Sequence, residues 1–277
     1  MLLPTAAAAQ TLQLTFRAPE SVADRRGDYP SAALRLALDK TEASHGPYRL
    51  EAAPAMNKLR TLKTLSNQTL PNFLAVLAFD ETHAQDGLDY VRFPLQFGAM
   101  GYRVCFVAPT KREAVAKAKS LEALKQFSFG QGAGWSDVAV LRSNGFKVVE
   151  VARYESLFAM LARGRFDLLC RGAIEIEAEM LAHPELTLEK TFALAYPLPM
   201  FFYTHKDNLA VKQRVAAGLQ IAFDDGSLPK LFNHYFRDGL QRVDLPSRRI
   251  HRLSNPAVAG VDFDFRKFDL RLIEALD

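Results

Sequence analysis

The stretch KVVEVARYESLFAMLARGRFDLLC, residues 147–170, changes its hydrophobic period twice. It opens with the β-branched run KVVEV, after which Leu157, Phe158 and Leu161 recur at helical spacing. It closes with the short apolar run FDLLC, which is typical of a buried strand. Strand, helix and strand in this order predict a βαβ unit, in which helices cover the faces of a mostly parallel sheet.

The same alternation of strand and helix extends in both directions along the chain. Before this unit it predicts strands at 11–17, 48–52 and 73–79 and helices at 29–40 and 57–66. Around the unit it predicts strands at 101–107 and 127–129 and helices at 136–144 and 173–182. Beyond the unit it predicts returning strands at 188–194 and 200–205 and helices at 211–224 and 228–235.

Two β/α series, the second closed by returning strands, indicate a lobe inserted within a lobe. We expect an α/β fold of two lobes on a double-strand hinge, with crossings near 104–107 and 193–196. Lobe one is expected at 11–105 and 195–245, and lobe two at 106–194.

The remaining residues, 246–277, form a C-terminal extension with a basic start and an apolar end. We expect it to pack on lobe one, because several large apolar side chains in water would be a liability. A contact between its basic residues and lipid head groups is the alternative.

Length and composition are those of a globular protein with two lobes of ordinary size. The chain has 277 residues, of which 49% are hydrophobic and 24% charged. No apolar run approaches the ~18 residues of a membrane span. The net charge of +4 is mild and the Lys and Arg are spread among acids, so no nucleic-acid partner is expected.

The first ten residues, MLLPTAAAAQ, are similar to the end of a secretory signal, where small residues precede the cut. We therefore expect a periplasmic location, with the signal removed or truncated; an Ala-rich end without targeting meaning is the alternative. Cys105 and Cys170 each lie in an apolar run, which favours buried thiols, although a periplasmic location permits a disulfide. No Cys/His grouping indicates a metal, and no cofactor is expected.

Several short motifs occur in an order that resembles a known family. They are FGQGAGW at 129–135, LARGRFDL at 161–168, YTHKDNL at 203–209 and DGSLPKL at 225–231. Together they resemble the type 2 periplasmic solute-binding proteins, the family 3-like substrate-binding subunits of ABC transporters. The resemblance covers residues 11–240 and implies a monomer that delivers a small solute to a membrane permease, and no enzymatic activity.

Two departures from this family concern the ligand. Amino-acid binders of the family usually carry a Thr-x-x-Arg element whose Arg grips the α-carboxylate, but the stretch 80–85, DETHAQ, has no Arg. They also place an Asp where this chain has Arg171. A guanidinium is a fork that matches a carboxylate or phosphate, so we expect a small anionic solute.

The candidate ligand-binding residues follow the predicted strands, because ligands of open α/β sheets bind at the carboxyl ends of strands. They are Arg171, Gln131, Gly132, Trp135, Tyr102, Arg103, Tyr29, Arg60, Phe79 and Glu175. For Arg171 the alternative is an ion pair with Glu175 or Asp137, and for the glycine-rich run it is a tight turn. Trp135 stacks on a ligand or packs in the core. Arg26 is interpreted as solvated.

Two other functions remain open on the same fold. One is a ligand-sensing protein or the sensor domain of a signalling system. The other is a dehydratase-like enzyme, for which Glu81, His83 and Glu175 are the only candidate acid or base residues.

Overall fold

A computed structural model describes residues 11–21 and 24–269. The signal-like segment 1–10 and the end of the extension, 270–277, lie outside the described residues. Within them no helix is long and apolar enough to cross a membrane.

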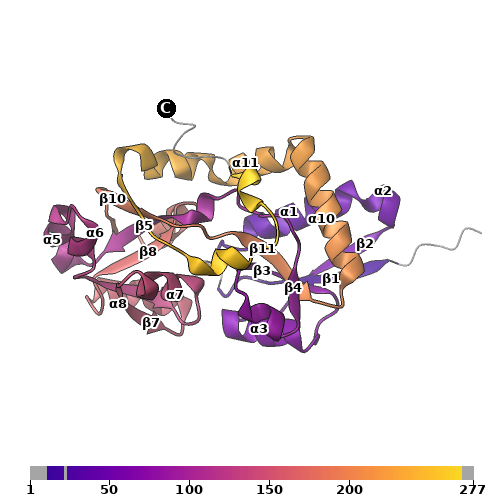
Figure 1. The fold of residues 1–277 in the computed structure, drawn as a ribbon, viewed down its shortest axis with the longest axis horizontal. Coiled ribbons are helices and arrows are strands. Elements are labelled where there is room, and N and C mark those ends of the chain that lie inside the picture. Colours follow the sequence, from indigo (N-terminus) through magenta and orange to yellow (C-terminus); the bar gives the residue numbers. More distant parts are fainter. Residues whose placement is uncertain (1–10, 22–23, 270–277) are drawn as a thin grey trace, which may run out of the picture.

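The described chain forms two sheets, each at the centre of one lobe (Figure 1). The first sheet has the order β2-β1-β3-β11-β4. Its strands are β1 (Leu12–Phe16), β2 (Tyr48–Ala52), β3 (Phe73–Ala78), β4 (Leu88–Tyr90) and β11 (Met200–His205). The second has the order β12-β10-β5-β8-β6-β7, with β9 beside β5. Its strands are β5 (Tyr102–Val107), β6 (Ser128–Gly132), β7 (Lys147–Val151), β8 (Leu168–Gly172), β9 (Thr187–Leu188), β10 (Phe192–Ala195) and β12 (Arg249–Arg252).

Helices cover both sheets, as a mixed α/β fold requires. The first lobe has α1 (Asp28–Lys40), α2 (Glu42–His45), α3 (Lys58–Ser66), α4 (Thr82–Gln85) and α10 (Leu209–Asp224). The second has α5 (Arg112–Lys117), α6 (Leu121–Leu124), α7 (Ser136–Ser143), α8 (Tyr154–Ala162) and α9 (Ile176–Ala182). The unit 147–170 therefore forms β7, α8 and the start of β8, as its pattern predicted.

Two chain segments join the sheets, but not where the sequence placed them. Residues 104–107 lie inside β5, which is the centre of the second sheet, and residues 193–195 lie inside β10. Residues 104–107 and 193–195 are all apolar and buried, which suits a central strand and not a crossing. The crossings are residues 91–101 and 196–199, and the amide of Tyr196 donates to the carbonyl of Gly101 at 3.0 Å. A side chain at Gly101 would collide with the Tyr196 carbonyl, so glycine allows this close pairing.

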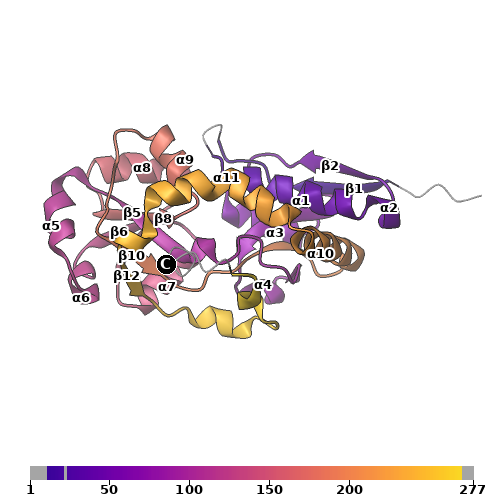
Figure 2. The same cartoon turned by 90° about the horizontal axis from the view of Figure 1, so that it is seen from above.

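The boundary of lobe one consequently lies before β5, and not at residue 105 as predicted. Helix α11 (Ser227–Val243) also differs, because it continues past the predicted end at 235. It begins on α1 and α10 and ends near α9, so it lies across both lobes (Figures 1 and 2).

The C-terminal extension was predicted to pack on lobe one, but it contacts both lobes. Its first part forms β12, which pairs in parallel with β10 of the second sheet. Asn255 then donates to the carbonyl of Pro197 at 2.9 Å, beside one crossing. Only the later part reaches the first lobe, where Phe265 packs under β3 and β11 and Phe268 packs on Phe93. The extension thus joins the two lobes a further time (Figure 2).

Cys105 and Cys170 form a disulfide, whereas their apolar surroundings in the sequence favoured buried thiols. The two residues lie directly opposite each other on the antiparallel strands β5 and β8. This register brings their Cα atoms within disulfide reach, and it depends on a pairing of strands 65 residues apart.

Candidate functional site

A cavity of about 680 Å³ lies between the lobes, a volume within the range of small-molecule sites. Its lining combines loops, strand ends and helix faces of both lobes. From lobe one it includes Phe16, Arg17, Asp24, Arg26, Tyr29, Lys58, Leu74, Val76, Ala78, Met200 and Phe202. From lobe two and α11 it includes Arg103, Trp135, Asp137, Tyr154, Arg171, Ile174, Glu175, Glu179, Tyr235 and Phe236.

Arg171 lies at the end of β8 and is 3% exposed. Its Nε donates to both oxygens of Glu179, at 2.7 and 3.0 Å, and its Nη2 lies 3.0 Å from Glu175. Burial alone would lower the pKa of Arg171, but the two carboxylates outweigh it and raise the pKa. Arg171 is therefore charged and already paired, and the ion pair with Glu175 that stood as the alternative is present.

Hydrogen bonds do not satisfy the whole of this guanidinium. Nη2 of Arg171 is buried and has no hydrogen-bond partner among the described residues, although Glu175 lies close to it. The guanidinium carbon lies 4.4 Å from the centroid of the Trp135 ring. Trp135 is the residue before α7 and is partly buried, so it meets both a core neighbour and the cavity.

Arg103 forms a second buried ion pair at the same end of the cavity. Its Nη2 lies 2.8 Å from Asp137, and its Nη1 lies 3.5 Å from Glu175. The Tyr196 hydroxyl donates to Asp137 at 2.5 Å, which ties this pair to the crossing at 196–199. Asp137 was the other predicted ion-pair partner of Arg171, but in the structure it pairs with Arg103.

Arg26 comes from lobe one and reaches across to lobe two. Its guanidinium carbon lies 4.0 Å from the centroid of Tyr154, and its Nε donates to Asp24 at 2.7 Å. The interpretation of Arg26 as a solvated residue is wrong, since its side chain is 18% exposed. Burial would raise the pKa of Asp24, but hydrogen bonds and the charge of Arg26 lower it to about 2.

Direct contacts between the lobes close the rim of the cavity. The Ser21 hydroxyl donates to Glu155 of α8 at 2.7 Å. The Lys58 ammonium, at the start of α3, donates to the Gly134 carbonyl at 2.7 Å. These contacts define a closed arrangement, in which burial lowers the pKa of Lys58 against the opposing charges of Asp80 and Asp137.

The glycine-rich run is a strand and not a ligand loop. Gly130 and Gly132 lie in β6 and pair with Val149 and Val151 of β7. A side chain at Gly130 would collide with the Phe166 ring, and one at Gly132 with the Trp135 ring. These glycines are therefore required by packing, and the turn follows at 133–134, where Gly134 has a φ of +75°.

Other predicted residues lie outside the cavity lining. Gln131 is fully buried in β6 and donates to the carbonyl of Cys170 at 3.2 Å. Arg60 is exposed on α3. Phe79 packs on Tyr90 and Phe201, on the face of the first sheet turned from the cavity. Tyr102 is the first residue of β5 and packs against the buried cluster that contains Leu157 and Phe158 of α8.

Five predicted residues do meet at the cavity. They are Arg171, Trp135, Arg103, Tyr29 and Glu175. The Tyr29 hydroxyl stabilises the fold, because it donates a hydrogen bond to the carbonyl of Leu95 at 2.8 Å.

The candidate enzymatic groups do not come together. His83 is buried against the Tyr203 ring, 5.1 Å between centroids, and Glu81 is exposed beside Gly260. Neither lines the cavity that holds Glu175. Across the described residues, no cluster of three His, Cys, Asp or Glu could hold a metal ion.

Solved structures with this fold cover most of the chain. An ancestral arginine-binding protein bound to arginine has a TM-score of 0.61 and 18% identity, over 83% of this chain and 100% of the other. A periplasmic binding protein of high arginine specificity from Salmonella typhimurium has a TM-score of 0.61 and 14% identity, over 82% and 100%. An amino-acid ABC transporter substrate-binding protein from Streptococcus pneumoniae, bound to L-arginine, has a TM-score of 0.60 and 15% identity, over 83% and 96%.

No protein-family model matches the chain, and no curated protein matches it. The structural likeness shows the fold. The chain has the two-lobed α/β fold of amino-acid ABC transporter substrate-binding proteins, which confirms the fold predicted from the motifs.

Proposed function

We propose that this protein is an extracytoplasmic solute-binding protein that captures a small solute by closing its lobes and presents it to an ABC-type importer. The observation that carries the proposal is the cavity between the lobes, to which both contribute charged and aromatic side chains. The two paired crossings supply a hinge, and the Ser21–Glu155 and Lys58–Gly134 contacts supply a rim that holds the closed state. The fold is that of solved substrate-binding proteins of amino-acid ABC transporters.

The expectation of an anionic solute loses its basis. It rested on Arg171 and on the glycine-rich run as anion contacts, but the structure pairs Arg171 with two carboxylates and places Gly130 and Gly132 in β6. Arg103 is likewise paired with Asp137. Among the charged lining residues, six are cationic and six are acidic. They are Arg17, Arg25, Arg26, Lys58, Arg103 and Arg171 against Asp24, Asp28, Asp137, Glu175, Glu177 and Glu179. We propose a zwitterionic or uncharged polar group on the solute, which agrees with the amino-acid ligands of the solved neighbours.

The lining beside Arg171 supplies contacts for that group. The Trp135 ring lies against the Arg171 guanidinium and lines the cavity, as does the Glu175 carboxylate. The ring would pack on the solute, while Glu175 would attract an ammonium group.

Native mass spectrometry of gently purified protein tests this function, followed by calorimetry with amino acids, amino-acid amides, dicarboxylates and polyamines. We expect one retained small molecule per chain and binding of zwitterionic members of the panel. Preferential binding of dicarboxylates would contradict the proposed charge. A chain that retains nothing and binds no member would contradict solute binding.

A further inference from the structure

The floor of the cavity on the lobe-one side is apolar, and the strand register explains why. In the antiparallel pair of β3 and β11, Val76 lies opposite Phe202 and Ala78 lies opposite Met200. Directly opposite residues point to the same face of a sheet, so these four side chains form one surface. That surface lines the cavity.

This surface is incompletely covered, although it belongs to central strands of the sheet. Val76 and Met200 are only partly buried, whereas Leu74 and Phe202 beside them are 1% and 2% exposed. Helices α1 and α10 pack on the rest of this face, and α11 passes above the uncovered part with Tyr235 and Phe236 at the lining. A ligand that covered this apolar area would gain hydrophobic free energy.

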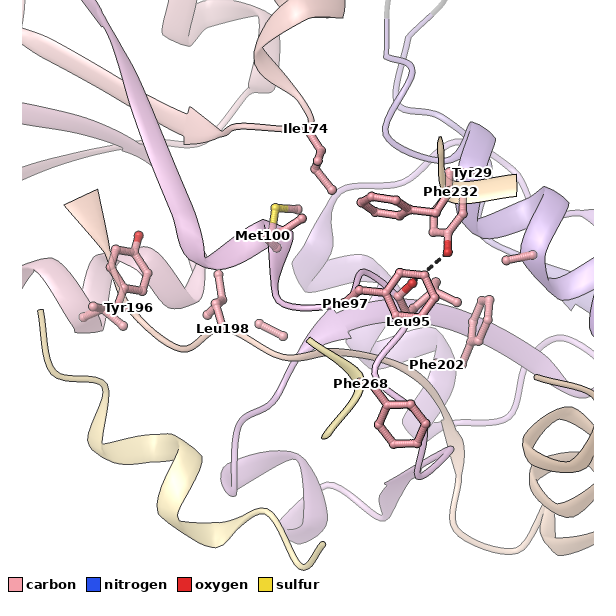
Figure 3. Packing of buried hydrophobic residues seen from close by; sticks show 14 of the residues in the cluster. Tyr29, Leu95, Phe97, Met100, Ile174, Tyr196, Leu198, Phe202, Phe232 and Phe268 are labelled. Atoms are coloured by element: carbon pink, nitrogen blue, oxygen red, sulfur yellow. Dashed lines mark hydrogen bonds between the residues drawn. The ribbon is translucent and has the colours of Figure 1, made fainter. Parts of the chain in front are cut away.

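The opposite wall of the same space is apolar too. Met100, at the end of one crossing, and Ile174, after β8, are 7% and 8% exposed and line the cavity. Figure 3 shows them between the second lobe and the Tyr29 and Phe202 side chains of the first. We call this space the apolar chamber, defined by Val76, Ala78, Met100, Ile174, Met200, Phe202 and Phe236.

Most charged side chains of the cavity are paired with one another, and Arg103 of these pairs borders the chamber, with its Nη1 3.3 Å from the sulfur of Met100. Paired charges offer a solute little net attraction. The largest gain in binding free energy would therefore come from apolar solute groups that cover the chamber. We infer that the solute is an amphiphile, whose polar group lies at Arg171 and Trp135 and whose aliphatic chain or ring fills the chamber. This inference rests on the proposed function, and it names the class of solute that the site takes.

The chamber is tested with uncharged apolar probes, namely Nile red and 1-alkanols from butanol to octanol. We expect Nile red to bind with increased emission and the alkanols to displace it, each added methylene tightening binding about three- to fourfold. Displacement that does not strengthen with chain length would overturn the inference.

Two variants place the probes in the chamber. Val76→Phe fills it and should weaken octanol binding more than tenfold, whereas Ile221→Phe places a phenyl ring on an exposed part of α10 and should change nothing. Met200→Ala enlarges the chamber and should extend the gain in affinity to longer alkanols. Wild-type affinity in a Val76→Phe protein with a cooperative melt would overturn the inference, as would an unshifted length preference in Met200→Ala.

The same variants separate the two proposals. A panel solute that compacts the protein yet binds Val76→Phe as tightly as wild type would overturn the chamber alone. Alkanols that bind as expected, in a protein that no solute compacts, would support the chamber and contradict capture by lobe closure.

Discussion

The guanidinium of Arg171 lies over the ring of Trp135, with 4.4 Å between its central carbon and the ring centroid. Arg26 approaches the same ring from the other lobe, at 5.8 Å. A single indole therefore contacts cations from both lobes, beside the rim contacts that hold them together. Separation of the lobes would remove Arg26 from this ring.

Replacing Arg171 by Ala should destabilise the fold by about 3–5 kcal/mol, because Glu179 would stay buried without a counter-charge. Urea unfolding measures this loss. The double variant Arg171→Met with Glu179→Gln removes both charges and should recover most of it. A single variant as stable as wild type would show that Arg171 is not a structural part of the site.

Replacing Lys58 by Met should weaken solute binding several-fold, since its ammonium donates to Gly134 across the closed rim. The loss reflects a smaller population of the closed state. Lys63→Met is the control, because Lys63 is exposed on the same helix. Equal affinities of the two variants would exclude a role of this contact in closure.

Acid should selectively remove the contribution of Asp24. Its pKa is about 2 in the folded state and 3.8 without its partners, so the stabilisation is complete above about pH 4 and is lost as the pH falls toward 2. Asp24→Asn should therefore cost about 2 kcal/mol at pH 7 and almost nothing near pH 2. The exposed Asp238→Asn is the control. A constant difference between Asp24→Asn and wild type across this range would contradict the assignment.

Removal of the disulfide with Cys105→Ala and Cys170→Ala should lower the free energy of unfolding by about 4 kcal/mol, as expected for a loop of 65 residues. Iodoacetamide should modify neither cysteine in the unfolded, unreduced wild type and both after reduction. Modification of both before reduction would show that the bond does not form.

Local patterns predicted much of the fold. Strands β2, β7 and β11 have the predicted bounds, because each is a short run between clear turn signals. The positions of the crossings were not predictable from such patterns. An apolar run such as Tyr102–Val107 indicates burial, but it does not say which sheet the strand enters.

Five of the predicted residues line the cavity, but their partners there were not predicted. Arg171 and Trp135 reach the cavity as expected, whereas their pairing depends on Glu179 and Arg26, which tertiary packing brings to them. The same limit applies to Gly132, whose lack of a side chain serves the nearby Trp135 ring. The chamber depends on the β3–β11 register and on the path of α11, and no single sequence motif predicts either of them.

Small-angle X-ray scattering of the protein with and without its retained solute tests the central claim most directly. We expect the solute-free protein to be more extended than the closed structure, and the added solute to reduce the radius of gyration to the value of that structure. An unchanged radius at saturating solute would contradict capture by lobe closure.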